Sequence, residues 1–301
     1  MHGGPHPTLG PFPALMRTAG WADYALVDSG KGRKLERFGT VSVVRPEAQC
    51  LWRPTLTKEA WECADAVFEA SDEEEAGRWR FARVIPLAWP MGWGRISFLA
   101  RATAFRHLGV FPEQATNWAW LDERLASCGS EFKFLNLFGY TGVASLVAAS
   151  RGASVTHVDA SKKAVAWGKE NAAHTGLSQA PIRWICEDAR KWVERESRRG
   201  ARYQGIILDP PKHGRGPAGE VWRLYEDLPA LLAGCAALLD GPAPFLLVNA
   251  YTERFSSLAL ASLVGQVAAG RGGAIEYGEL ALVEEGGARG LGLSAFARWS
   301  V

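Results

Sequence analysis

The amino-acid sequence predicts an α/β protein whose main domain is a doubly wound, mostly parallel sheet. Two observations support this fold class. An apolar run, FKFLNL, ends in a tight turn that carries Gly139 and Gly142, and a small-residue helix follows at once. Further along, strand, helix and terminal acid repeat in step, because apolar runs end at Asp159, Asp188 and Asp209. In such a sheet the carboxyl ends of the strands form the place where a nucleotide-like ligand binds.

Length and composition limit the number of domains, the class of partner and the compartment that the sequence can indicate. A chain of 301 residues is long enough for about two domains. Its formal charge, 34 − 32 = +2, indicates no polyanion partner, although a local basic patch remains compatible with it. Five cysteines without paired spacing fit a reducing compartment and no zinc site. Because the first residues lack an apolar leader core and no run reaches membrane length, we expect a cytoplasmic protein without a membrane partner.

The N-terminal third is expected to hold a flexible arm and a small β-rich region. Residues 1–20 are rich in Gly, Pro and His, which predicts the arm. In residues 21–104, YALVDSG and VSVVRP are typical of strands on either side of a charged connection, KGRKLERFG. Lys58–Phe68 has helical spacing. We expect this region to bind substrate or to act as a lid for a catalytic domain that covers residues 105–301.

Two stretches of the β-rich region are candidates for contact with nucleic acid. Arg78–Arg101 interleaves arginine with aromatic residues, as surfaces that stack bases do. Trp89 and Trp93 are its candidates for stacking, although most of the 13 tryptophans must belong to the core. The charged connection offers cations to phosphates, and a solvated hairpin loop is the simpler interpretation. These cations are Lys31, Arg33, Lys34 and Arg37.

The catalytic domain continues the alternation of strands and helices. A helix, NWAWLDERLAS, precedes the central strand, and another, ARKWVERESRRG, follows Asp188. After Asp209 come a basic loop, KHGRGPAGE, an amphipathic helix, VWRLYEDLPALLAGCAALL, and a fifth strand, PAPFLLVNAY. A helix over residues 256–269 leads to two strands, AIEYGELALVE and LSAFARWS, with no helix between them. Such a pair fits an antiparallel hairpin at the end of a seven-stranded sheet.

The three acids discriminate between two nucleotide-like cofactors. A dinucleotide enzyme uses an acid about twenty residues beyond the glycines, where Asp159 stands, but it has no role for Asp209-Pro210-Pro211. S-adenosylmethionine, an adenosine sulfonium with a methionine tail, engages all of them. Asp159 accepts from the ribose hydroxyls and Asp188 from the adenine amino group. The glycine turn faces the methionine part, and Asp209-Pro210-Pro211 edges the pocket where the methyl group leaves.

The motifs NLFGYTG, VDAS, ENAAHTGL, CEDA and LDPPK resemble those of the class I S-adenosylmethionine-dependent methyltransferases. More narrowly, they resemble the bacterial 23S ribosomal RNA methyltransferase group that carries YTG and DPPK. The resemblance covers roughly Phe105 to the C-terminus. It implies a Rossmann-like class I methyltransferase fold, S-adenosylmethionine as cofactor, no metal, and RNA, with ribosomal RNA favoured, as partner.

The resemblance also implies a set of cofactor-binding residues. In the family, a segment before the first strand folds over the cofactor, and of Pro112-Glu113-Gln114 only the glutamine matches that segment. The expected cofactor-binding residues are Gln114, Asn136, Phe138, Gly139, Tyr140, Thr141, Gly142, Asp159, Ala160, Ser161, Asn171, Asp188, Ala189 and Asp209.

Methyl transfer from a sulfonium is an in-line displacement, in which the enzyme holds the nucleophile close and excludes water. Asp209 and the Pro210 carbonyl offer acceptors that orient a nitrogen or oxygen nucleophile. Relatives that make 5-methylcytosine carry a cysteine just after the fifth strand, whereas this chain has Asn249, Ala250 and Tyr251 there. We therefore expect direct displacement without a covalent cysteine adduct. The expected catalytic residues are Asp209, Pro210, Lys212, Asn249 and Tyr251.

Three alternatives remain open from the sequence. The same catalytic domain could methylate a small molecule or a protein side chain, with the N-terminal region as a lid. A nicotinamide-dependent oxidoreductase would instead bind NADH. A non-catalytic RNA-binding module would bind RNA without affinity for the sulfonium cofactor. The oligomeric state is also open, a homodimer included.

Overall fold

The computed structural model describes residues 5–71, 77–251, 255–287 and 289–301. The chain divides into two compact units. Unit 1 comprises Met1–Met16, Asn117–Leu280 and Leu293–Val301, and unit 2 comprises Arg17–Thr116 and Ala281–Gly292. The predicted cofactor acids all belong to unit 1.

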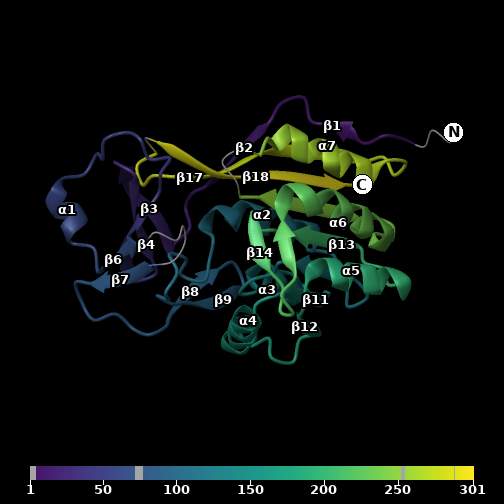
Figure 1. The fold of residues 1–301 in the computed structure, drawn as a ribbon, viewed down its shortest axis with the longest axis horizontal. Helices are drawn as coiled ribbons and strands as arrows, with labels where there is room; N and C mark the ends of the chain where they lie inside the picture. Colours follow the sequence, from purple (N-terminus) through teal and green to yellow (C-terminus); the bar gives the residue numbers. More distant parts are fainter. Residues whose placement is uncertain (1–4, 72–76, 252–254, 288) are drawn as a thin grey trace. The chain divides into compact units, whose positions relative to one another are not determined.

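Unit 1 is built on the predicted mixed sheet (Figure 1). Its strands in spatial order are β12, β11, β10, β13, β16, β18 and β17. The first five run parallel to one another, and β18 is antiparallel to β16. The bounds are β10 Lys133–Leu137, β11 Ser154–Asp159, β12 Ile182–Cys186, β13 Gly205–Leu208, β16 Phe245–Ala250, β17 Ala274–Val283 and β18 Gly290–Ser300. The prediction of a mostly parallel α/β sheet with C-terminal antiparallel pairing is confirmed.

Two short strands extend this sheet. Thr8–Leu9 forms β1, which lies parallel to β17, and Ala14–Thr18 forms β2, which also pairs with β17. Among the described residues the sheet therefore has nine strands. Residues 8–9 and 14–18 were expected to lie in a flexible arm. They are ordered instead by backbone hydrogen bonds to an edge strand, which composition alone does not reveal. Residues 1–4 of that arm lie outside the described residues.

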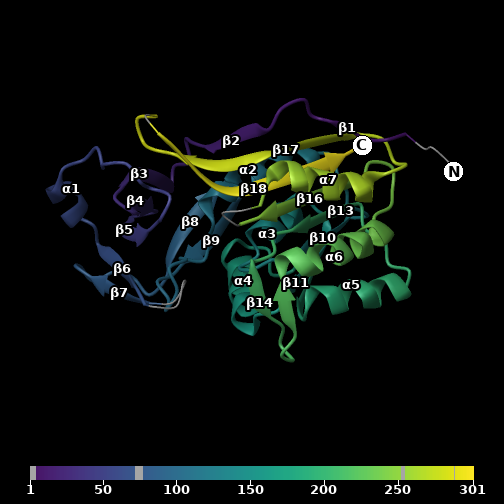
Figure 2. The ribbon, with the colours of Figure 1, turned by 45° about the horizontal axis from the view of Figure 1, so that its top comes forward.

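Helices follow the strands as the sequence predicts. Their bounds are α2 Ala115–Arg124, α3 Val143–Ser150, α4 Lys162–His174, α5 Ala189–Arg198, α6 Leu224–Leu238 and α7 Ser257–Ala268. Figure 1 and Figure 2 both show α5, α6 and α7 side by side. Their apolar faces share one buried core with the strands, to which Trp192, Leu228 and Val264 contribute. This packing accounts for the apolar side chains on one face of the central strands.

Unit 2 contains a five-stranded sheet, in the order β3, β4, β5, β6 and β7, and a separate β8–β9 hairpin. The strand bounds are β3 Tyr24–Gly30, β4 Arg33–Phe38, β5 Val41–Pro46, β6 Ala66–Ala70, β7 Gly77–Phe81, β8 Trp89–Trp93 and β9 Ile96–Ala100. A short helix, α1, covers Lys58–Glu62. The helix predicted over Lys58–Phe68 is thus too long, because Ala66 and Phe68 are buried on one face of a strand.

The charged segment predicted as a hairpin connection is in fact the strand β4. Its charges are satisfied inside unit 2, which is why it is tolerated there. The Glu36 carboxylate accepts hydrogen bonds from Arg45 Nε and Nη2, both at 2.7 Å, and one from the Tyr24 hydroxyl at 2.9 Å. Lys34 lies 3.8 Å from Glu36 and 3.7 Å from Glu47.

No helix among the described residues is long and apolar enough to cross a membrane. No group of three or more His, Cys, Asp and Glu side chains in the same ranges is arranged to hold a metal ion.

Candidate functional site

The predicted site residues of unit 1 converge because their strands are parallel and in register. Leu137 of β10 is paired with Val158 of β11 on one side and with Leu208 of β13 on the other. Leu208 is in turn paired with Val248 of β16. The glycine turn, Asp159, Asp209 and Asn249 therefore lie along one edge of the sheet. We call the glycine turn together with Asp159 the cofactor edge. Asp209 and the segment that follows it form the acceptor edge.

The turn after β10 has an unusual backbone. Phe138 and Tyr140 adopt left-handed φ angles of 56° and 49°, and Gly142 has a φ of 85°. Strain of this kind costs about 1–3 kcal/mol per residue and concentrates at functional sites. Gly139 is required for lack of space rather than for its φ angle, because a Cβ there would lie 2.4 Å from Cε1 of His157. The sequence identified the turn correctly but could not assign its left-handed positions.

A buried polar chain holds the turn from behind. Asn136 Nδ2 donates to Ser145 Oγ at 2.9 Å, and Ser145 Oγ lies 3.0 Å from His157 Nδ1. Burial lowers the pKa of His157 to about 3, so the imidazole is neutral. Asn171 Nδ2 donates to the Thr141 carbonyl at 2.9 Å. Asn136 and Asn171, both expected to bind cofactor, thus use their amide N–H groups to support the turn.

Ser145 and His157 were missed by the sequence reasoning. The signal was a single histidine inside the apolar run SVTHVD, at a position that alternation assigns to a buried face. Both residues are fully buried. The aromatic ring of Trp184 lies 4.6 Å from the His157 ring and closes the space beside Gly142.

Asp159 ends β11 beside the turn. Its Oδ2 accepts from the Tyr140 backbone N–H at 2.8 Å, and its Oδ1 accepts from the Ser161 N–H at 2.7 Å. Burial raises the pKa of this carboxyl, and the two N–H donors act in the opposite direction. Each carboxylate oxygen has two acceptor positions, so both can still accept from the hydroxyls of a ribose. Ala160 follows, and Ser161 caps α4 by accepting from the Ala164 N–H.

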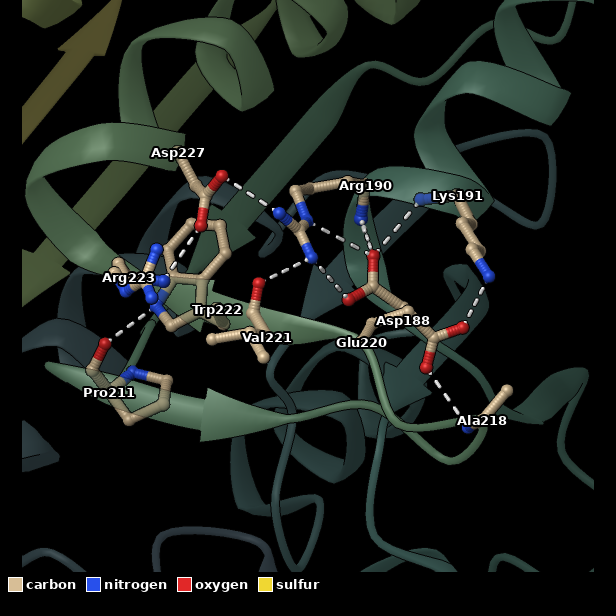
Figure 3. A network of polar contacts seen from close by, with 10 residues as sticks. All are labelled: Asp188, Arg190, Lys191, Pro211, Ala218, Glu220, Val221, Trp222, Arg223 and Asp227. Carbon is tan, nitrogen blue, oxygen red and sulfur yellow. Dashed lines mark hydrogen bonds and ion pairs between the residues drawn. The ribbon is translucent and has the colours of Figure 1, made fainter.

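Asp188 caps the next helix and anchors a charged network (Figure 3). Its Oδ1 accepts from the backbone N–H groups of Arg190 and Lys191 at 3.0 and 3.2 Å. Its Oδ2 accepts from Arg190 Nη2 at 3.2 Å, which leaves one acceptor position for an adenine amino group. Ala189 begins α5 and is buried.

The acceptor edge follows β13. The Asp209 N–H donates to the Leu137 carbonyl at 3.4 Å, which ties this acid to the strand that carries the turn. Pro210 is buried, while Pro211 and Lys212 are exposed. A short hairpin follows, with β14 at His213–Arg215 and β15 at Val221–Arg223. The sequence predicted a flexible loop here and a helix that began at Val221.

The other predicted catalytic residues lie at the end of β16. Asn249 is buried, and its Oδ1 accepts from Asn117 Nδ2 at 2.9 Å. This contact fixes the orientation of the Asn249 amide. Tyr251 is the next residue after β16 and is half-buried. Both belong to unit 1, as do Asp209 and the turn.

The remaining candidates belong to unit 2. Gln114 lies in a buried 3₁₀ helix, Pro112–Gln114, with Glu113, whose pKa is raised by burial. Trp89 is buried and donates its Nε1 proton to the Phe38 carbonyl, so its predicted role in base stacking is wrong. Lys34, a candidate for phosphate contact, is buried between carboxylates, so both that role and the simpler interpretation of a solvated loop are wrong for it. Lys31 and Arg33 are exposed, and Arg37 and Trp93 are half-buried.

Comparisons with known proteins agree with the fold. The chain is similar over 98% of its length, and over 96% of the other, to the crystal structure of the SAM-dependent methyltransferase from Agrobacterium tumefaciens, with 48% identity and a TM-score of 0.94. A proposed methyltransferase complexed with SAH shares the fold at 16% identity and a TM-score of 0.72, covering 94% of this chain and 76% of that one. Residues 114–227 match the family model described as conserved hypothetical protein 95.

Curated relatives match a shorter part of the chain. Ribosomal RNA large subunit methyltransferase K/L from Shewanella frigidimarina is 38% identical over 117 residues, and its counterpart from Psychromonas ingrahamii is 36% identical over 118 residues. These segments represent 38% of this chain in both cases, but only 16% and 15% of the relatives. The chain therefore matches about one sixth of the length of these relatives.

Proposed function

Because this chain belongs to the S-adenosylmethionine-dependent methyltransferases, we propose that it transfers the methyl group to a nitrogen or oxygen atom of RNA, with ribosomal RNA favoured. The cofactor is S-adenosylmethionine. The observation that carries the proposal is the arrangement of the sheet edge, where Asp159 and Asp209 end the strands on either side of the glycine turn. RNA as substrate is supported by the likeness to the K/L ribosomal RNA methyltransferases.

The residues at the cofactor edge fit the group that they would hold. Gly139 leaves the turn without a side chain at its closest approach to the sheet, and Asp159 offers acceptors for the ribose hydroxyls. Asp188 keeps one acceptor position for the adenine amino group. When bound there, S-adenosylmethionine supplies an electrophilic methyl group on its sulfonium. The contribution of the chain is to hold the two reactants close together and to exclude water.

At the acceptor edge, Asp209 and the Pro210 carbonyl would orient the nucleophile. A nitrogen or oxygen carries its own lone pair and needs only an acceptor for its proton. A pyrimidine carbon would need a thiolate to activate it first. None of the five cysteines of the sequence lies in the segment between β13 and α6 or after β16. Burial raises the pKa of Cys235 in α6 to about 12, which favours its unreactive thiol. These features support direct displacement.

The test is transfer of a labelled methyl group from S-adenosylmethionine. The protein would be offered total RNA, naked ribosomal RNA and assembled ribosomal subunits, all from a host that lacks it. We expect label in ribosomal RNA, and nuclease mapping then identifies the methylated atom. If no RNA is labelled although calorimetry detects binding of S-adenosylmethionine, the substrate is a small molecule or a protein. A methylated pyrimidine carbon would contradict the direct displacement.

A further inference from the structure

The β14–β15 hairpin begins directly after Asp209-Pro210-Pro211 and has two different faces. Its strands are antiparallel, with Gly214 opposite Trp222 and Arg215 opposite Val221. Because side chains alternate along a strand, Gly214 and Trp222 share the inner face. Trp222 is only 3% exposed, whereas the side chains of the outer face are all exposed. The outer face consists of His213, Arg215, Val221 and Arg223.

The inner face is fastened to both edges of the site. Trp222 Nε1 donates to the Pro211 carbonyl at 2.7 Å, and the Trp222 ring lies 4.9 Å from the ring of Phe138 in the glycine turn. The Lys212 carbonyl accepts from the Leu224 N–H at 3.0 Å. One residue, Trp222, thus touches the turn that faces the cofactor and the prolines that face the nucleophile.

Arg190 and Lys191 brace the hairpin from α5 (Figure 3). Arg190 Nη2 donates to the Val221 carbonyl at 2.9 Å, and Arg190 Nη1 donates to Asp227 at 2.8 Å. Lys191 forms an ion pair with Glu220, whose carboxylate also accepts from the Ala218 N–H at 2.9 Å. The hairpin is therefore held in one position before any substrate arrives.

The brace also determines the charge of the hairpin. From Lys212 to Arg223 the only acidic residue is Glu220, and Lys191 together with a backbone N–H occupies it. Arg223 forms an exposed pair with Glu226, a type of contact that contributes little and is easily exchanged. Within the part of the chain that the structure describes, neither Lys212 nor Arg215 forms an ion pair. The exposed side of the hairpin is thus cationic.

We infer that this hairpin is a preformed arm that binds the phosphate backbone of single-stranded RNA beside the nucleotide to be methylated, with Lys212 and Arg215 as its phosphate contacts. The inference rests on the proposed function, since it names how the RNA is held. Lysine and arginine bind phosphate without regard to sequence and so fix register and orientation. Because the hairpin is already ordered, RNA binding carries no free-energy cost for ordering it.

The experiment measures the salt dependence of RNA binding. The protein as a full chain, its Lys212→Ala/Arg215→Ala double variant and each single variant are titrated with a short, fluorescently labelled single-stranded RNA at several salt concentrations. Each phosphate contact on a single strand contributes about 0.7 to the slope of log affinity against log salt. We expect the slope to shrink by about 0.7 in each single variant and by about 1.4 in the double variant, with S-adenosylmethionine affinity unchanged.

The control removes the same charge elsewhere in unit 1. Lys169→Ala/Arg198→Ala takes away two exposed cations, one on α4 and one in the last turn of α5, at the end opposite Asp188. Its slope should equal that of the native protein. An equal loss of slope in both double variants would overturn the inference. The effect would then come from the electrostatic field of the whole protein and not from contacts of the hairpin.

Three combinations of results distinguish the hairpin inference from the proposed function. If the native protein methylates RNA while the Lys212→Ala/Arg215→Ala slope is unchanged, the arm is wrong and the proposed function stands. If the native protein neither binds nor methylates RNA, both are wrong. Slope loss confined to the hairpin variants, with methylation of RNA by the native protein, supports both.

Discussion

The cofactor edge and the acceptor edge are adjacent in the sheet, yet they are held by different kinds of contact. Behind the glycine turn the contacts are neutral and buried, and they run from Asn136 through Ser145 to His157. Behind the hairpin they are mostly ionic and partly exposed, centred on Arg190 and the Lys191–Glu220 pair. The turn is thus held by neutral buried hydrogen bonds, whereas the hairpin adds ion pairs to the packing of Trp222.

This difference has physical consequences. Buried neutral hydrogen bonds are not screened by salt, and a turn supported by them tolerates no extra volume. Ion pairs near the surface contribute little individually and weaken as ionic strength rises. We therefore expect the cofactor edge to be rigid and unforgiving of substitution, and the acceptor edge to be adjustable. Five predictions test this contrast.

The largest effect is expected at the acceptor edge itself. Asp209→Ala should lower kcat at least about a hundredfold, because the nucleophile loses the acceptor that orients it. Cofactor affinity, measured by calorimetry, should stay close to that of the native protein. Asp209→Asn keeps one oxygen acceptor and should retain more activity than the alanine variant. Normal turnover by Asp209→Ala would remove this residue from the mechanism.

At the cofactor edge, Gly139→Ala should instead weaken the binding of S-adenosylmethionine. The new Cβ would lie 2.4 Å from Cε1 and 2.5 Å from Nδ1 of the buried His157 ring, so the turn must move. Overpacking of this kind costs about 1–3 kcal/mol, which should be visible as lower stability and weaker S-adenosylmethionine binding. Gly129→Ala is the matched control, since no atom lies within 4 Å of its Cβ and its φ is not left-handed. A Gly139→Ala variant with native affinity would show that the turn is not rigid.

Lowering the pH should destabilise the folded protein through His157. Burial lowers the pKa of this imidazole from 6.5 to about 3, so between these values the unfolded chain binds a proton that the folded protein does not. The free energy of unfolding should fall as the pH drops from 6.5, by about 1.4 kcal/mol per pH unit for one proton. His157→Asn should remove this part of the slope in urea titrations at several pH values. A variant that keeps the full slope would assign it to other groups.

The hairpin should respond to acid in a lower range. The hydrogen bond from Lys191 lowers the pKa of Glu220 to about 2 from its usual 4.5. Its contribution to stability is therefore complete above pH 4.5 and is lost as the pH falls towards 2. In that sense the two edges of the site lose their support in different windows of pH.

The smallest effect is expected for the hydrogen bond that Trp222 of the hairpin donates to Pro211. Trp222→Phe keeps a ring against Phe138 but removes the N–H that holds the Pro211 carbonyl. A hydrogen bond of this kind contributes about 0.5–1.5 kcal/mol, so kcat should fall by roughly three- to tenfold. Affinity for S-adenosylmethionine should not change. The opposite result, weaker cofactor binding at unchanged kcat, would assign Trp222 to the cofactor edge.

Much of the site could be read from the sequence because its residues stand at the ends of apolar runs. Asp159, Asp188 and Asp209 each close such a run, and parallel strands bring their carboxyl ends to one edge. Hydrophobic periodicity does not show which contacts a polar side chain makes. For this reason it does not indicate that the amide N–H groups of Asn136 and Asn171 support the turn, or that His157 takes part in the hydrogen bonds behind it. The cofactor contacts expected of Asn136 and Asn171 stay predictions.

The N-terminal region was harder to predict for the same reason. Lys34 and Trp89 have the residue types of a nucleic-acid surface, but both are buried with partners in unit 2. Charged β4 looks like a loop until the side-chain hydrogen bonds from Arg45 of β5 to Glu36 are known. Residue type predicts a role only where the residue is exposed, and exposure depends on contacts between distant segments.

By itself the sequence determined the alternation of strands and helices from β10 to β13, the glycine turn and the three terminal acids, because these depend on local periodicity and backbone preference. Only the tertiary structure decided which face each polar residue occupies. It converted a basic loop into a braced hairpin, since Trp222, Arg190 and Lys191 meet Pro211, Val221 and Glu220 through contacts that no local pattern encodes. Those contacts arise when α5 and the hairpin pack over the same edge of the sheet.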